Sequence, residues 1–77
     1  MIHPIKNVIY TLRELRRINN KSLDEVAKAL GVVARTVYYY ETGQRRLSLE
    51  QVIILAKLYD VSAEEIIEGQ LVVCSTD

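Results

Sequence analysis

Three serines that are each followed three positions later by an acid or an amide mark where helices can begin in this 77-residue chain. The pairs are Ser22 and Glu25, Ser48 and Gln51, and Ser62 and Glu65. In such a capping box the serine oxygen accepts the backbone N–H three residues on, and the longer side chain accepts the N–H of the serine. Because the three boxes are close together, the helices that they begin must be short.

Apolar residues recur at three- and four-residue spacing in five segments, which predicts five helices. The expected helices cover residues 5–18, 23–30, 34–41, 49–59 and 63–68. Gly31, Gly43 and Gly69 follow three of them as C-caps, where glycine adopts the left-handed conformation without strain. Five short helices with brief connections predict an all-α fold, a compact bundle, and not a long coiled coil.

The two ends of the chain are less regular than its centre. Thr11 and Glu14 also match a capping box, but they fall inside the first periodic segment, so the match is interpreted as a coincidence. Residues 71–74 are apolar and β-prone, and they follow the last expected helix. We therefore expect a domain of residues 1–69 and a C-terminal tail of residues 70–77, which is a candidate dimerisation segment.

The composition disfavours several classes of protein. Cys74 is the single cysteine, so no internal disulfide can form, and a lone cysteine fits a reduced cytoplasmic compartment. His3 is the single histidine, so neither a histidine-based metal cluster nor an acid–base relay can be built. No apolar run approaches the ~18–20 residues that cross a bilayer, and no signal-peptide layout is present. We expect a cytoplasmic protein that is not an enzyme and binds no metal, cofactor or small-molecule substrate.

The net charge is zero, but its distribution along the chain is strongly uneven. Residues 1–46 hold nine of the ten Lys and Arg against four acids, a net charge of +5. Residues 47–77 hold one Lys against six acids, a net charge of −5. Such a chain can present one basic and one acidic face. The basic face is either a nucleic-acid surface or an ordinary solvated one.

The passage from residues 23–30 through Gly31 to residues 34–41 is the most informative part of the chain about function. Two helices joined by a short turn that contains glycine can hold the second helix at a steep angle to the first. In DNA-binding proteins of this geometry, the first helix braces across the phosphate backbone while the second enters the major groove.

Seven short motifs in the order and spacing of one known family span about three quarters of the chain. They are LRELR at 12–16, SLDEVA at 22–27, LGV at 30–32, RTV at 35–37, YETG at 40–43, LAK at 55–57 and VSAEEII at 61–67. On these residues the chain resembles the lambda-repressor/Cro-like (Xre-type) helix-turn-helix proteins. The resemblance implies a transcriptional regulator, expected to be a repressor, that docks as a homodimer on a palindromic operator in double-stranded DNA.

Three positions depart from the family pattern. Val33 stands where the family usually has Ser or Thr as the cap of the recognition helix, a loss on the order of 1 kcal/mol. Leu23 stands where a Gln often helps to grip a phosphate, and Leu47 stands where Pro is frequent. The first two departures put the usual DNA contacts in question and leave the fold intact.

Four residues are candidates for reading bases because they fall on the outward side of the third expected helix when Val37 and Tyr40 face inward. They are Ala34, Arg35, Tyr38 and Tyr39. Arg35 could bind guanine O6 and N7 through two parallel hydrogen bonds, and Ala34 could contact a thymine methyl. The tyrosines could contact phosphates or base edges. The alternative is a solvated helix face or a protein-binding patch.

Seven polar or basic residues are expected to contact phosphates. They are Lys21, Ser22, Thr36, Thr42, Gln44, Arg45 and Arg46. Arg45 and Arg46 lie in the loop after the recognition helix, where guanidinium groups can clamp phosphates. Lys21 and Ser22 lie at the start of the second expected helix, whose free N–H groups attract anions. The alternative for the two arginines is a solvated loop.

The remaining expected contacts hold helices or protomers together. The resemblance implies an ion pair between Arg16 and Glu41 that ties the first helix to the third. The expected dimer surface lies in the acidic C-terminal half and consists of Ile66, Ile67, Leu71 and Val73. A tail strand that pairs with its symmetry mate is one arrangement, and a monomer with a loose tail is the alternative.

A protein-interaction module on the same fold is the second hypothesis. In an antitoxin-like or coregulator-like domain, Leu23 and residues 38–40 would bind a protein partner. The zero net charge and the departures at Val33 and Leu23 favour this hypothesis slightly. Salt-dependent binding to random duplex DNA separates the two hypotheses.

Overall fold

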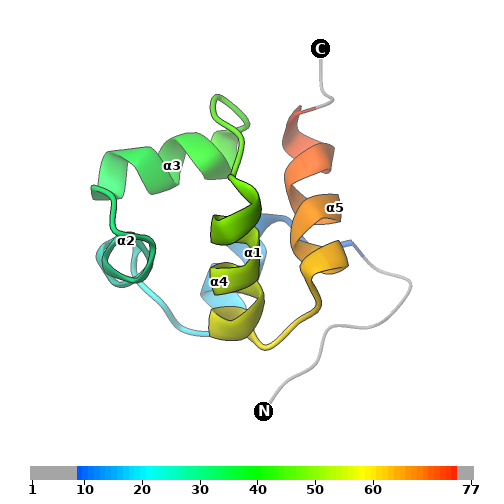
Figure 1. Ribbon diagram of the computed structural model, residues 1–77, viewed down its shortest axis with the longest axis horizontal. Coiled ribbons are helices and arrows are strands. Elements are labelled where there is room, and N and C mark those ends of the chain that lie inside the picture. Colours follow the sequence, from blue (N-terminus) through cyan, green and yellow to red (C-terminus); the bar gives the residue numbers. More distant parts are fainter. Residues whose placement is uncertain (1–8, 75–77) are drawn as a thin grey trace.

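The computed structural model describes residues 9–74, which form five helices and no strand (Figure 1). The helices are α1 (Leu12–Ile18), α2 (Leu23–Leu30), α3 (Ala34–Thr42), α4 (Leu49–Tyr59) and α5 (Ala63–Cys74). The predicted all-α bundle is therefore confirmed, and α2 and α4 have the bounds expected from the sequence. Helix α3 is one residue longer than expected and ends at Gly43, which is in the left-handed conformation.

All three serine capping boxes form. At the start of α2, the Ser22 N–H donates to Glu25 Oε1 at 2.8 Å, and the Glu25 N–H donates to Ser22 Oγ at 3.1 Å. The same reciprocal bonds form in the other two boxes, Ser48 with Gln51 and Ser62 with Glu65. Val33 begins α3 without a side-chain hydrogen bond, as the absence of Ser or Thr at this position predicts.

The structure corrects the predicted start of α1. Thr11 and Glu14 form a fourth capping box, with the Thr11 N–H donating to Glu14 Oε1 at 2.8 Å, so their match to the pattern is no coincidence. Thr11 is extended, with ψ at 164°, and the helix begins at Leu12. Ile9 precedes the helix and is 54% exposed, and the expected helical residues 5–8 lie outside the described residues. Two cap bonds outweigh apolar periodicity in deciding where this helix starts.

The end of α5 is the second correction. The helix continues through Gly69 to Cys74, so the β-prone tail predicted to follow residue 69 is wrong in the part that the structure describes. Gly69 is not a cap but an interior residue, since a Cβ there would lie 2.5 Å from the carbonyl oxygen of Tyr10. The glycine lets α5 lie directly against the segment that leads into α1. The expected boundary between residues 69 and 70 therefore falls inside a helix.

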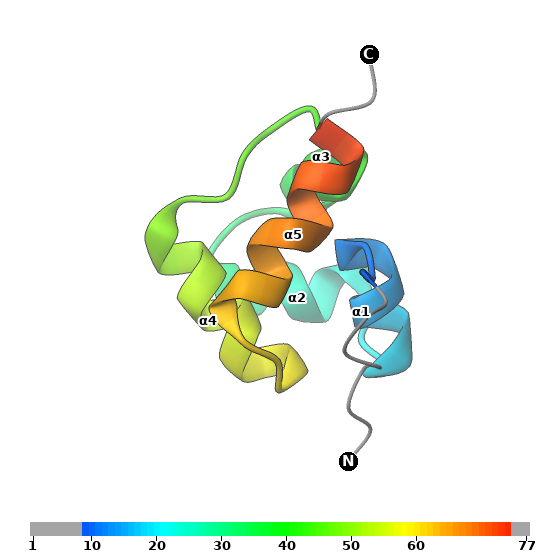
Figure 2. The same ribbon diagram turned by 90° about the vertical axis from the view of Figure 1, so that its right-hand side faces the viewer.

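The helices pack so that α3 lies along one edge of the molecule. Figure 1 views α2 nearly end-on while α3 runs across the picture, which shows the steep angle that the short turn predicts. The turn depends on the left-handed Gly31, with φ at 72°, and on the Val32 N–H, which donates to the Ala27 carbonyl at 3.0 Å. Helix α5 packs against α4 and α3 (Figure 2), and α1 contacts α3 and α5.

One apolar core joins the helices, and every helix contributes to it. Its buried members are Leu12, Leu15, Val26, Ala27, Leu30, Val37, Tyr40, Val52, Leu55, Tyr59 and Ile66. Isolated helices of 7 to 12 residues are marginal in water, so burial of this shared surface is what holds each of them in place.

A largely buried ion pair joins α1 to α3. Arg16 Nε donates to Glu41 Oε2 at 2.7 Å, and Arg16 Nη2 donates to Glu41 Oε1 at 3.3 Å. The third group, Nη1, donates to the Lys21 carbonyl at 3.0 Å, so the pair also holds the turn between α1 and α2. The bond to Glu41 raises the pKa of Arg16, and burial, together with the nearby Glu41 carboxylate, raises the pKa of Tyr59. The expected ion pair is thus present and holds α3 from its inner side.

Substitution of Gly69 tests whether this residue is a close contact. Helix propensity alone predicts that Gly69→Ala stabilises an interior helical position by about 1 kcal/mol. We expect instead a loss of at least about 1 kcal/mol, because the new Cβ would displace the Tyr10 carbonyl. Denaturant unfolding at an unchanged m-value measures the difference. A more stable variant would show that α5 does not rest on this segment.

Single and double substitutions test the ion pair. Glu41→Leu leaves the Arg16 guanidinium without its carboxylate and should lower the free energy of unfolding by about 3 kcal/mol. Arg16→Met combined with Glu41→Leu should recover part of that loss, since no unpaired charge remains. Arg17→Ala, at an exposed position of α1, is the control and should change the free energy by less than about 0.5 kcal/mol. Equal losses in Glu41→Leu and the double variant would exclude an unpaired charge as the cause.

Candidate nucleic-acid interface

The outward side of α3 carries the residues expected to read bases. Arg35 and Tyr38 are exposed, Tyr38 by 50%, while Ala34 and Tyr39 are half-buried. The two tyrosine rings lie 6.1 Å apart at a tilt of 55°. Within the described residues the Arg35 guanidinium has no hydrogen-bond or ion-pair partner, so its donors are available to a ligand. The buried Val37 fixes the opposite side of the helix in the core.

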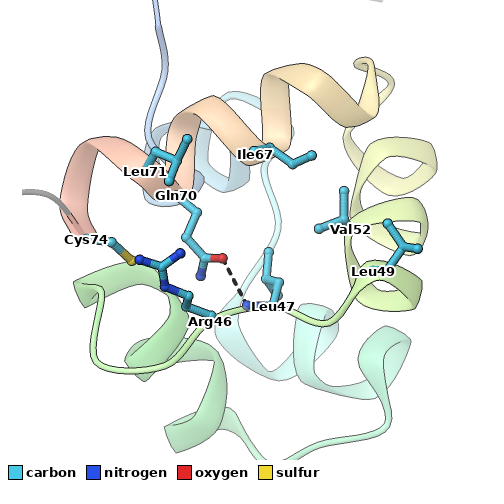
Figure 3. Close-up of a pocket in the computed structure, with 8 residues that line it drawn as sticks. All are labelled: Arg46, Leu47, Leu49, Val52, Ile67, Gln70, Leu71 and Cys74. Carbon is cyan, nitrogen blue, oxygen red and sulfur yellow. Dashed lines mark hydrogen bonds between the residues drawn. The ribbon is translucent and has the colours of Figure 1, made fainter.

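The loop between α3 and α4 holds two exposed arginines on a backbone that α5 braces. Gln70 Nε2 donates to the Arg45 carbonyl at 3.0 Å, and the Leu47 N–H donates to Gln70 Oε1 at 2.9 Å. Figure 3 shows Gln70 reaching from α5 to the loop, with Arg46 beside it. The side chains of Arg45 and Arg46 are exposed. The backbone of the loop is therefore held while its two charges remain accessible.

Sequence reasoning missed Gln70 because it placed this residue in the tail. The signal that could have found it is the helical spacing of Ile66, Gln70 and Val73, which continues past Gly69. Gly43 adds a second contact between the loop and α5. Gly43 has a φ of 81°, and a Cβ at this position would lie 2.8 Å from the Val73 carbonyl oxygen. The last turn of α5 thus lies against the start of the loop.

Three of the expected phosphate contacts already have partners within the protein. The Thr42 hydroxyl donates to the Tyr38 carbonyl at 3.0 Å and accepts the Gln44 amide at 3.0 Å. Ser22 uses both its N–H and its hydroxyl oxygen in the box with Glu25. Hydrogen bonding from the backbone N–H and the side chain of Ser22 lowers the pKa of Glu25, which keeps a carboxylate at the start of α2. A phosphate at these positions would have to displace or share existing contacts.

Two other expected phosphate contacts lie apart from each other. Lys21 and Thr36 are both half-buried. Lys21 lines a cleft between α2 and α4, together with Lys28 and Leu58, whereas Thr36 lies on α3. Lys21, the cation that precedes α2, therefore lines a cleft to which no residue of α3 contributes. Of the seven candidates, only the two loop arginines combine an exposed side chain with the absence of a side-chain partner among the described residues.

The expected dimer surface is divided by the structure. Ile66 is 0% exposed, so it belongs to the core and its place in the expected set is wrong. Ile67 and Leu71 are exposed by 43% and 46%, and Val73 is half-buried. Adjacent residues on a helix point about 100° apart, so Ile66 can face the core while Ile67 faces outward.

Metal-binding and membrane-spanning features are absent from the described part of the chain. Residues 9–74 contain no group of three or more His, Cys, Asp or Glu that could hold a metal ion. None of the helices described is long and apolar enough to cross a bilayer. Cys74 is half-buried, with its Sγ 3.8 Å from the Gly43 carbonyl oxygen. What the structure shows is a set of exposed side chains on α3, followed by a basic loop that Gln70 braces.

Comparisons with known proteins point to one family. The helix-turn-helix domain family matches residues 11–68. The chain is 43% identical over 56 residues to the HTH-type transcriptional regulator AnsR of Bacillus subtilis. The aligned residues make up 73% of this chain and 48% of that protein. It is 32% identical over 56 residues to the uncharacterized HTH-type transcriptional regulator YobD of the same organism, 73% of this chain and 50% of that protein. It is 37% identical over 57 residues to the putative HTH-type transcriptional regulatory protein TK0539 of Thermococcus kodakarensis, 74% of this chain and 18% of that protein.

The matched segment contains the whole helix-turn-helix unit. The chain spans about half the length of the first two relatives, and no solved structure matches it significantly.

The family match begins at the cap of α1, includes α2, the Gly31 turn, α3 and α4, and ends within α5. The chain therefore belongs to the helix-turn-helix domain family, and this match is consistent with the resemblance of its motifs to the lambda-repressor/Cro-like (Xre-type) proteins.

Proposed function

We propose that this protein binds double-stranded DNA in a sequence-specific way and regulates transcription, with α3 in the major groove. The observation that carries the proposal is the uncovered side of α3, where Arg35 and Tyr38 lie exposed on the same molecule as the braced loop of Arg45 and Arg46. The major groove of B-DNA admits one α-helix and presents a distinct pattern for each base pair. Three relatives named as HTH-type transcriptional regulators or regulatory proteins support the proposal.

In this proposal the residues of α3 read the bases. Arg35 has an unpartnered guanidinium among the described residues, and its planar fork fits guanine O6 and N7. Ala34 is small enough to meet a thymine methyl group. Tyr38 and Tyr39 contact neighbouring base edges or the backbone through their rings and hydroxyl groups. Discrimination between sequences therefore depends mainly on Arg35.

Phosphate contacts come mainly from the loop after α3. Arg45 and Arg46 are exposed, and the two bonds from Gln70 hold their backbone, so little loop entropy is lost on binding. The other candidates contribute less, because they are already bonded, half-buried or directed toward α4. They are Lys21, Ser22, Thr36, Thr42 and Gln44.

We further propose that the protein acts in the cytoplasm as a repressor that occupies a palindromic operator as a homodimer. One small DNA-binding module binds weakly, and two copies can span half-sites about one helical turn apart. Ile67 and Leu71 expose apolar surface on α5 and line, with Leu49 of α4, a groove of about 240 Å³ (Figure 3). A symmetric partner would cover this surface, with Val73 at its edge.

Two arginine variants distinguish base reading from phosphate binding. Arg35→Ala should weaken binding to an operator selected from random DNA by about 1–3 kcal/mol and relax the preference at one base position. Arg46→Ala should weaken binding to operator and random duplex alike and lower the slope of log K against log salt concentration by about one unit. Fluorescence anisotropy over a range of salt concentrations measures both effects.

Lys57→Ala, which removes an exposed cation from α4, is the control for the change in net charge. If Arg35→Ala and Arg46→Ala lost affinity equally on operator and random DNA, the assignment of Arg35 to bases would be wrong. If the unaltered protein bound no duplex at any salt concentration, DNA binding itself would be wrong. The protein-interaction hypothesis would then replace it, with Leu23, Tyr38 and Tyr39 as its surface, because Tyr40 is buried in the core.

Leu71→Glu tests the dimer. A charge in the α4–α5 groove should convert the dimer to a monomer in sedimentation equilibrium. Arg46 lines the same groove, so the test is read from the oligomeric state and not from the affinity for DNA. Ile53→Glu is the matched control, since Ile53 is also 46% exposed but does not line the groove. A monomeric parent protein at operator-binding concentrations, or equal effects of the two substitutions, would contradict the proposed interface.

A further inference from the structure

A second cleft lies between α1, the start of α2 and one side of α3. Its volume is about 280 Å³, and residues of all three helices line it: Arg13, Arg16, Leu23, Tyr38, Glu41 and Thr42. The half-exposed ring of Tyr38 belongs both to this cleft and to the outward side of α3. A ligand that lies along the outward side of α3 can therefore reach the mouth of the cleft.

The cleft carries one uncommitted positive charge. Arg16 directs its three nitrogens to the Glu41 carboxylate and the Lys21 carbonyl, so the charges of Arg16 and Glu41 offset each other. Arg13 is exposed and has no hydrogen-bond or ion-pair partner within the part of the chain that the structure describes. The positive net charge of the cleft therefore comes from Arg13.

The side chains at the start of α2 offer an anion little else. The Leu23 side chain, on the first residue of the helix, has no hydrogen-bonding group, and the exposed carboxylates of Asp24 and Glu25 follow it. Lys21 lines the separate cleft between α2 and α4. Arg13 is therefore the available cation of the cleft where α2 meets α3, and it comes from α1.

We propose that this cleft binds one phosphodiester group of the DNA backbone, with Arg13 as its ligand and Leu23 and Tyr38 packed against the deoxyribose of the same nucleotide. The proposal rests on the proposed DNA binding and adds a contact that reaches the DNA from α1. A guanidinium fork matches a phosphate through two parallel hydrogen bonds, and apolar side chains suit the carbon skeleton of the sugar. Phosphate contacts from α1 and from the loop of Arg45 together fix how α3 enters the groove.

Arg13→Ala and Arg17→Ala form a matched pair for the test. Both arginines are exposed on α1 and both substitutions remove one positive charge, but Arg13 lines the cleft and Arg17 does not. We expect Arg13→Ala to weaken binding to operator and random duplex alike, on the order of fivefold, and to lower the salt slope by about one unit. Arg17→Ala should change the slope much less. Thermal unfolding checks that both variants keep the parent fold.

A neutral backbone locates the contact. Uncharged methylphosphonate groups are placed one at a time along one half-site. At one position the group should weaken binding of the unaltered protein but not of Arg13→Ala, which has already lost the contact to that phosphate. That position should differ from the one at which Arg46→Ala becomes insensitive. Equal effects of Arg13→Ala and Arg17→Ala, or an unchanged methylphosphonate profile in Arg13→Ala, would overturn the proposal while DNA binding stands. Failure of the unaltered protein to bind any duplex would instead remove the function on which the proposal rests.

Discussion

The position of α3 depends on the carboxylate of Glu41, which lies on a residue only 8% exposed and therefore needs a partner. Arg16 supplies that partner from α1 with two of its nitrogens and directs the third to the carbonyl just before α2. One guanidinium thus connects the helix-turn-helix unit to the helix behind it. Because an unpaired buried charge costs several kcal/mol, α3 strongly favours one rotation about its axis. That rotation leaves Arg35 and Tyr38 on the outside.

Helix α5 has a comparable role for the loop that follows α3. Gln70 bonds the backbone of the loop at two points, and the glycines at 43 and 69 remove side chains where α5 meets the loop and the segment before α1. The family match ends at residue 68, so the contacts of Gln70 lie beyond the matched segment. The loop arginines, to which we propose to assign phosphate binding, are therefore braced by a residue that lies outside the family match.

Local patterns predicted the centre of the fold well. Helices α2 and α4 follow their serine boxes and apolar spacing residue by residue, because cap bonds join groups three positions apart and need no distant partner. The cap at Thr11 is equally local, but it lies inside an apolar-periodic segment. The apolar pattern therefore predicts a start for α1 that is too early. Gly69 is ambiguous in sequence because glycine both ends helices and permits close approach. Its neighbour, Tyr10, is distant along the chain, so no local pattern reveals it.

The sequence by itself determined the all-α class, the starts of four helices, the turn at Gly31 and the family. Only the tertiary structure decided which polar groups are free. It places Lys21 in a cleft beside α4, and it brings Arg13, for which the sequence predicts no contact, to a cleft beside α3. A cap or an apolar stripe is complete within one or two turns of chain and is therefore legible in sequence. A cleft between three helices depends on residues far apart, and it leaves no trace in local periodicity.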